Sequence, residues 1–128
     1  MSKDKLKVLF VAAEVVPFAK TGGLADVSGA LPKALKKLGA EIIVVMPRYY
    51  KIDKSQLQAL PGALGVPMGP IGELWCEVFT SFIPGSDVPI YFIDYEAYFG
   101  RSGLYDEEGN AFEDNDNRFI FLSKAALQ

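Results

Sequence analysis

The sequence predicts an α/β fold whose open, mostly parallel sheet carries one β-hairpin. Two apolar, β-branched runs at residues 6–13 and 41–47 flank a segment with helical spacing, so they form a strand–helix–strand unit with a right-handed crossover. Two further strand-like runs, 74–83 and 88–93, are separated by turn residues and predict the hairpin. Residues 1–128 are expected to form one small domain, because half of them are apolar and can build a core.

The first strand, residues 6–13, is nearly all apolar and is expected to be buried on both faces. The helix after it spans about residues 24–38 and ends before Gly39, a residue suited to a helix C-terminus. Pro32 removes a backbone hydrogen bond inside this helix, so a kink or break is expected near Ser28. Apolar residues at steps of three and four predict the face that packs on the sheet. These residues are Leu24, Val27, Leu31, Leu35 and Leu38.

The second strand, residues 41–47, is also apolar and is ended by a proline. Prolines and glycines argue against long elements between residues 48 and 73. Residues 99–113 predict a loop, and a final helix spans about residues 116–127. Three aromatic or aliphatic residues after the second strand are expected to pack on the sheet: Tyr49, Tyr50 and Ile52. The candidate caps of the final helix are Asp114 and Asn115.

Composition excludes several classes of function. The net charge of −3 gives no basic face for nucleic acid, and no apolar run approaches the roughly 18–20 residues of a membrane span. The chain has no histidine, and its acidic stretches at 106–110 and 113–116 lack the spacing of a calcium loop, so no metal site is predicted. The single Cys76 fits a core position. The N-terminus shows no signal or transit pattern, so the cytoplasm is the expected compartment.

The segment Lys20-Thr21-Gly22-Gly23 carries the strongest chemical signal. It lies between the first strand and the first helix, where open α/β sheets bind ligands. Paired glycines let backbone N–H groups approach an anion, the helix N-terminus favours negative charge, and Lys20 adds a mobile cation. This pattern predicts a phosphate or diphosphate site. A plain Gly-Gly turn beside a solvated lysine remains the alternative, because short glycine motifs are common.

Two carboxylates flank this segment. Glu14 ends the first strand and is expected to face the same cleft as Lys20. Asp26 lies in the first helical turn, where it either stabilises the helix dipole or binds a hydroxyl at the mouth of the cleft. A paired-carboxylate glycosidase is not indicated, since no spacing places two acids across a sugar.

The block Lys20-Thr21-Gly22-Gly23-Leu24-Ala25-Asp26-Val27 resembles the N-terminal signature of glycogen and starch synthases. Glu14-x-x-Pro17 precedes the block and Gly29-Ala30-Leu31-Pro32-x-Ala34-Leu35 follows it, as in that family. The resemblance spans almost the whole chain in the family's order, with little support between residues 50 and 74. The later matching segments are Val45-Met46-Pro47-x-Tyr49, Tyr91-Phe92-Ile93-Asp94, Phe99-x-Arg101-x-Gly103-x-Tyr105 and Asp114-Asn115-x-x-Arg118-Phe119.

This resemblance implies a glycosyltransferase of the GT-B type, built from two Rossmann-like halves. Such enzymes transfer glucose from ADP-glucose to the non-reducing end of an α-1,4-glucan with retention of configuration, and they need no metal or other cofactor. It further implies that Lys20, Thr21, Gly22 and Gly23 contact the diphosphate. Glu14 and Asp26 would line the acceptor side of the cleft as the candidate catalytic residues.

The resemblance also implies that residues 1–128 are an incomplete N-terminal, acceptor-side domain. The essential histidine of the family and the nucleotide-sugar domain do not occur in this chain, so the chain alone is expected to be inactive. Its final helix should lead to another strand, and the missing strand would leave a sheet edge that favours self-association. A stand-alone phosphate-, nucleotide- or glucan-binding module remains the alternative function. The choice between ADP-glucose and UDP-glucose also stays open, because the missing half reads the base.

Overall fold

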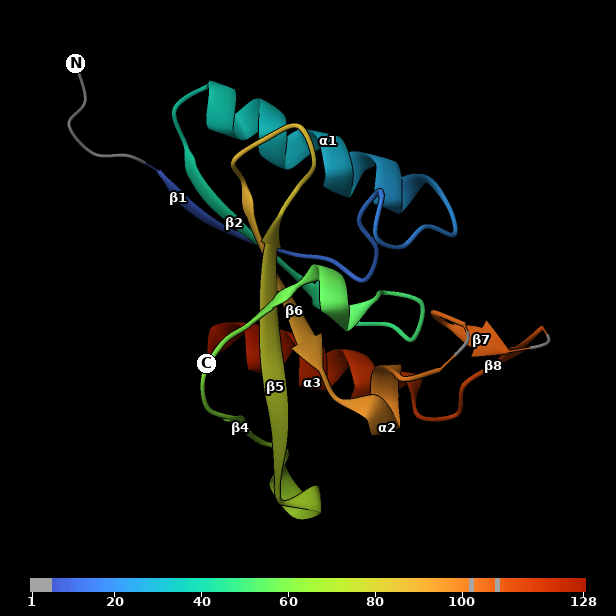
Figure 1. Cartoon of the computed structure of the whole chain (residues 1–128). Helices are drawn as coiled ribbons and strands as arrows, with labels where there is room; N and C mark the ends of the chain where they lie inside the picture. Colours follow the sequence, from blue (N-terminus) through green and yellow to red (C-terminus); the bar gives the residue numbers. More distant parts are fainter. Residues whose placement is uncertain (1–5, 102, 108) are drawn as a thin grey trace.

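The computed structural model describes residues 6–101, 103–107 and 109–128. A mixed sheet with the strand order β1-β2-β6-β5-β3, to which β4 adds by pairing with β5, lies between α1 and α3 (Figure 1). A small β7–β8 ribbon extends from one end of the molecule. The strands are β1 (Lys7–Val11), β2 (Glu41–Pro47), β3 (Gln58–Ala59), β4 (Leu64–Pro67), β5 (Glu73–Phe82), β6 (Pro89–Asp94), β7 (Asp106–Glu107) and β8 (Asn110–Ala111). The helices are α1 (Gly23–Lys37), α2 (Glu96–Phe99) and α3 (Asn115–Leu127), with single 3-10 turns at η1 (Lys54–Gln56) and η2 (Gly69–Ile71).

The centre of the sheet confirms the predicted α/β fold. Strands β1, β2 and β6 are parallel, and β5 and β6 form the predicted antiparallel hairpin. The side chains of Val44, Ile90 and Phe92 are fully buried between the two helical layers, as the apolar runs predict. Cys76 is buried in β5 as a free thiol, which confirms its core position.

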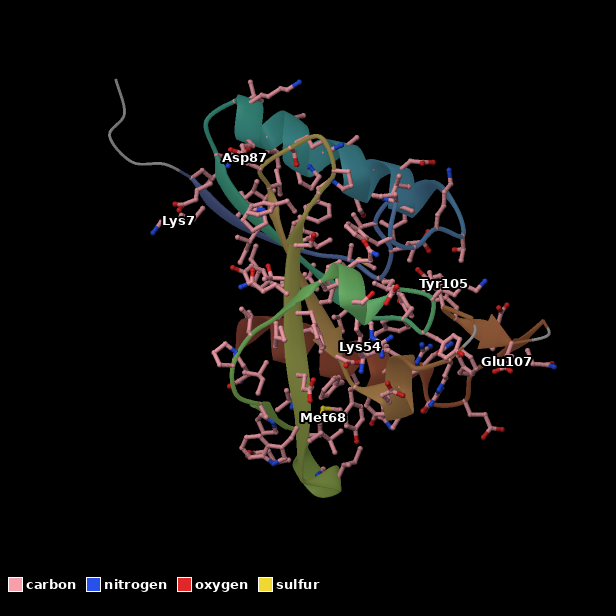
Figure 2. All side chains as sticks on the ribbon, viewed as in Figure 1. Lys7, Lys54, Met68, Asp87, Tyr105 and Glu107 are labelled. Carbon is pink, nitrogen blue, oxygen red and sulfur yellow. The ribbon has the colours of Figure 1, made fainter. Side chains whose placement is uncertain are left out.

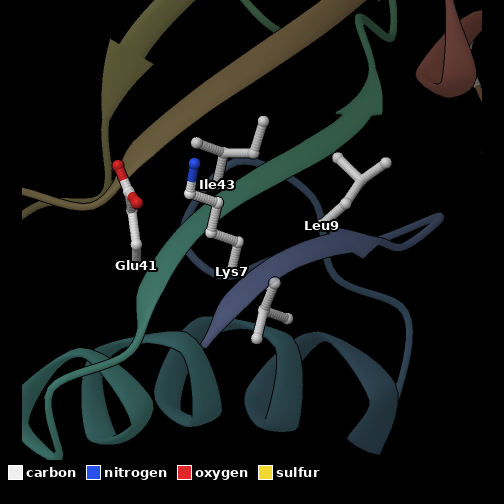
Figure 3. Close-up of a pocket in the computed structure, with 5 residues that line it drawn as sticks. Lys7, Leu9, Glu41 and Ile43 are labelled. Carbon is white, nitrogen blue, oxygen red and sulfur yellow. The ribbon is translucent and has the colours of Figure 1, made fainter. Parts of the chain in front are cut away.

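Strand β1 differs from the prediction of a strand buried on both faces. It is an edge strand, and no strand among the described residues pairs with its outer side. Consequently Leu9 is 41% exposed and Val11 is 38% exposed. A groove follows this edge, and Figure 3 shows Lys7 and Leu9 of β1 beside Glu41 and Ile43 of β2.

Helix α1 ends before Gly39, whose φ of 97° favours glycine, as predicted. The predicted buried face is wrong for most of its residues, although Leu35 is partly buried and packs against the core. Leu24, Val27 and Leu31 are 41–54% exposed, whereas a row of small residues faces the interior. The predicted break near Ser28 is also absent, because the helix is continuous through Pro32. The buried residues of the helix are Ala25, Ser28, Gly29 and Pro32.

The connecting segments contain more structure than the sequence predicts. The expected loop at 99–113 includes the β7–β8 ribbon. Of the residues expected to pack on the sheet, Tyr49 and Ile52 are buried, but Tyr50 is 68% exposed. Asp114 precedes α3 as predicted, but its carboxylate binds Arg101 instead of capping the helix.

Within the described ranges, no helix combines the length and apolar character needed to cross a membrane. The N-terminal residues 1–5 and Glu108 of the first acidic stretch lie outside the described residues.

Candidate functional site

The candidate site is the loop from the end of β1 to the start of α1. Two contacts fix the ends of this loop. The Tyr49 hydroxyl donates to the Ala13 carbonyl at 2.6 Å, and the Val16 N–H donates to the Ala25 carbonyl at 3.1 Å. Because Gly22 is the N-cap of α1, the loop places the first N–H groups of the helix next to Lys20. Helix geometry gives those N–H groups no intrahelical acceptor, so they suit an anion.

Lys20 and Asp26 form an ion pair across the loop. The Lys20 ammonium lies 2.9 Å from each carboxylate oxygen of Asp26, and both side chains are more than half exposed. Exposed pairs of this kind contribute roughly 0–1 kcal/mol. The pair can therefore open at little cost when an anion approaches Lys20. Asp26 occupies the first helical turn, as the sequence predicts, but its direct partner is Lys20.

Glu14 lies beneath the loop and is only 2% exposed. Its Oε1 accepts hydrogen bonds from the N–H groups of Thr21 at 3.0 Å and Gly22 at 3.1 Å. Its Oε2 accepts from the Thr21 hydroxyl at 2.7 Å and from the Tyr105 hydroxyl at 2.6 Å. Glu14 was expected to face the cleft directly. Instead the loop covers Glu14, and Glu14 is linked to the site through its hydrogen bonds with Thr21 and Gly22.

The electrostatics keep Glu14 ionised. Burial raises the pKa of Glu14, but the hydrogen bonds from Tyr105, Thr21 and Gly22 outweigh burial and lower it from 4.5 to about 2. Burial together with the neighbouring carboxylate raises the pKa of Tyr105 above its ordinary value. At neutral pH the pair is therefore a carboxylate that accepts from a neutral phenol.

Tyr105 is a residue of this site that sequence reasoning missed. It precedes β7, and its hydroxyl reaches Glu14 across 91 positions of the chain. Figure 2 labels Tyr105 on the side of the molecule where the loop before α1 lies. Tyr105 did belong to a segment that resembles the synthase family, and that segment was the only available signal.

Two hollows flank the loop. A pocket of about 190 Å³ beside it is lined by Phe18, Lys20, Tyr49 and Lys51, among others. A wider groove on the other side is lined by Asp26 and by residues of α1 such as Lys33. Lys20 and Asp26 therefore lie between two open spaces, and Lys51 is a second cation that the sequence analysis did not single out.

In the part of the chain that the structure describes, no group of three acidic, cysteine or histidine residues is placed to hold a metal ion.

Comparison with known proteins identifies the family of this chain. Residues 7–128 match the family model described as the starch synthase catalytic domain. The chain belongs to this family. Two curated members of the starch and glycogen synthase group are close in sequence. Glycogen synthase 1 of Geobacter metallireducens is 57% identical over 126 residues, and the glycogen synthase of Treponema denticola is 50% identical over 127 residues.

The family resemblance inferred from the sequence is thereby confirmed, and so is the fold. The catalytic domain of starch synthase IV from Arabidopsis thaliana, solved with ADP and acarbose bound, superposes with a TM-score of 0.81 at 28% identity. That match covers 97% of this chain and 25% of the plant protein. The Geobacter match likewise covers 97% of this chain and 25% of the relative. The chain therefore spans about a quarter of the length of the starch synthases it matches.

Proposed function

We propose that the full-length protein is a glycogen or starch synthase that transfers glucose from ADP-glucose to the non-reducing end of an α-1,4-glucan with retention of configuration. The observation that carries the proposal is the Lys20–Asp26 loop, a helix N-terminus with a mobile cation, in a chain 57% identical to a glycogen synthase. ADP is bound in the plant starch synthase structure, which favours ADP-glucose over UDP-glucose as donor.

In this proposal Lys20 and the N-terminus of α1 bind the diphosphate of the donor. The departing ADP gains negative charge, and fixed donors aimed at that charge stabilise the transition state. Thr21 and Gly22 direct their N–H groups to Glu14, so the backbone donors nearest the diphosphate begin at Gly23.

Asp26 lies at the mouth of the site. When Lys20 binds the diphosphate, the Asp26 carboxylate is released from its ion pair. The Asp26 carboxylate then binds a sugar hydroxyl. The attacking 4-hydroxyl of the glucan needs only to be held in line with the anomeric carbon.

We further propose that residues 1–128 form part of the acceptor-side domain of the full-length enzyme. The nucleotide-sugar domain lies in the rest of the protein. The partners of the full-length protein are ADP-glucose and the glucan. The short coverage of the relatives, about a quarter of their length, supports this arrangement. The cytoplasm remains the predicted location, and fractionation of cells with an antibody to the protein tests it.

A glucose-transfer assay tests the proposed function. Radiolabelled ADP-glucose and glycogen are incubated with the full-length protein and, in parallel, with residues 1–128 alone. Label should pass to glycogen only with the full-length protein. If neither protein transfers label while a known synthase does, a binding or regulatory module becomes the better account.

Replacing Lys20 tests the assignment of the diphosphate. In the full-length enzyme, Lys20→Ala should raise the KM for ADP-glucose by roughly 10-fold or more, because a charge-assisted contact to phosphate is lost, while the KM for glucan changes less. Lys124→Ala, at an exposed lysine in the last turn of α3, is the matched control and should leave both KM values unchanged. A larger effect of Lys20→Ala on the KM for glucan would overturn the assignment.

A further inference from the structure

We propose that Glu14 and Tyr105 are positioning residues that hold the diphosphate-binding loop in its working conformation. This inference rests on the proposed function for the role of the loop. It goes beyond that function by giving Glu14 and Tyr105 a task that involves no contact with substrate.

The hydrogen bonds of Glu14 exclude a direct contact with substrate in this conformation. An ionised carboxylate offers about four lone-pair positions, two on each oxygen. The N–H groups of Thr21 and Gly22 occupy Oε1, and the hydroxyls of Thr21 and Tyr105 occupy Oε2. All four positions are used, and the residue is 2% exposed. Glu14 therefore has neither a free lone pair nor an open path to a sugar.

The same four contacts define the shape of the loop. Two consecutive N–H groups directed at one oxygen set the orientation of the Thr21 and Gly22 peptides. Gly22 is the N-cap of α1, so its orientation decides where the next N–H groups of the helix point. Lys20 immediately precedes these peptides. Glu14 thereby positions both donors of the proposed diphosphate site, which are the Lys20 ammonium and the N–H groups at the start of α1.

Tyr105 is itself held in place by α3. The Tyr105 carbonyl accepts from the Asn115 side chain at 2.9 Å and from the Phe112 N–H at 3.1 Å.

Arg118, fully buried in α3, donates to the carbonyls of Leu104 at 2.8 Å and Tyr98 at 2.7 Å. The guanidinium also lies over three aromatic rings. These rings belong to Phe99, Phe112 and Phe119. The loop before α1 is thus fixed from the opposite side of the sheet.

Substitution by glutamine separates positioning from catalysis. In Glu14→Gln, the amide oxygen can keep both N–H contacts, and the amide NH₂ can donate to the two hydroxyls, which rotate to accept. The shape of the network survives while the negative charge is lost. A catalytic carboxylate would need its charge, whereas a positioning carboxylate needs only this geometry.

The experiment compares Glu14→Gln, Glu14→Ala and Tyr105→Phe with the wild type in the full-length enzyme. Glu14→Ala should raise the KM for ADP-glucose by about 10-fold or more, because it removes four hydrogen bonds from the loop. Glu14→Gln should raise it by less than about threefold, since neutral hydrogen bonds replace charged ones. Tyr105→Phe should fall between them. Tyr50→Phe, at an exposed tyrosine, is the matched control and should have no effect.

Hydrogen–deuterium exchange of the peptide that covers residues 15–24 gives a second readout that does not depend on turnover. Exchange should accelerate in Glu14→Ala and stay close to wild type in Glu14→Gln. Equal losses in Glu14→Gln and Glu14→Ala, with a shifted pH profile of kcat, would make Glu14 a catalytic charge and overturn the proposal. Unchanged exchange and KM in Glu14→Ala would also overturn it. If the wild type transfers no glucose, the proposed function fails, but exchange still decides whether Glu14 holds the loop.

Discussion

Glu14 shows how the balance of forces at one residue decides a protonation state. Removal from water favours the neutral acid, but donors from Thr21, Gly22 and Tyr105 favour the carboxylate more strongly, and the pKa falls to about 2. Because the ordinary pKa is 4.5, the ionised group stabilises the folded state at pH values above about 4.5. This contribution is lost as the pH falls from about 4.5 towards 2.

This sign gives a testable pH dependence. In the full-length enzyme, the wild type should be more stable than Glu14→Gln at pH 7, and the difference should shrink between about pH 5 and pH 3. The loss amounts to at most about 3 kcal/mol for a shift of this size. Melting temperatures of both proteins measured across this range provide the test. A difference that stays constant over the range would contradict the lowered pKa.

The packing of α1 is decided by small residues. Gly29 faces the loop after β1, and a Cβ built there would lie 2.9 Å from the Val16 carbonyl oxygen. The Val16 N–H also donates to the Ala25 carbonyl in the same helix, so the backbones of loop and helix lie close together. A leucine-lined face could not approach so closely. Leu24, Val27 and Leu31 therefore lie on the outer side of α1, exposed in this chain.

Gly29→Ala should destabilise the protein despite the better helix propensity of alanine. The propensity gain is about 1 kcal/mol, whereas overpacking against a backbone carbonyl costs about 1–3 kcal/mol. Chemical denaturation of the full-length enzyme measures the difference. Gly23→Ala is the matched control, because its Cβ would meet nothing within 4 Å. Equal or greater stability of Gly29→Ala would show that the loop moves away at no cost.

At the scale of the whole molecule, the outer edge of β1 is an edge of the sheet that no described strand covers. Apolar residues line it, and the end of α3 lies beside it, since Leu9, Ile43 and Gln128 line one hollow. Figure 1 shows α3 on the opposite side of the strands from α1. Right-handed crossovers on opposite faces extend a parallel sheet in opposite directions. We therefore propose that in the full-length enzyme a further strand pairs with β1.

Residues 1–128 expressed alone should consequently self-associate through this edge, because unpaired strands with apolar side chains pair with other copies. Size-exclusion chromatography with light scattering should show a mass that rises with concentration. Leu9→Lys should reduce this association, whereas Tyr50→Lys, on the loop after β2, should not. A clean monomer at high concentration would contradict the prediction.

The parts of the fold that depend on neighbouring residues were predictable. Residues 41–47 and the hairpin around residues 84–87 form as predicted, because apolar runs and turn residues act over a few positions. Local spacing likewise predicted the Lys20–Gly23 loop and the position of Asp26 in the first helical turn. A specific order of motifs was enough to indicate the family.

Other features depended on contacts between distant segments. The pairing of Glu14 with Tyr105 joins residues 91 positions apart, and no local pattern encodes such a contact. The buried face of α1 was ambiguous, because the small residues Ala25, Ser28, Gly29 and Pro32 recur at the same steps of three and four as the leucines. The choice between the two faces depended on which one could approach the loop backbone. The exposure of β1 likewise depended on its place in the strand order, since an apolar run has the same sequence at the centre of a sheet and at its edge.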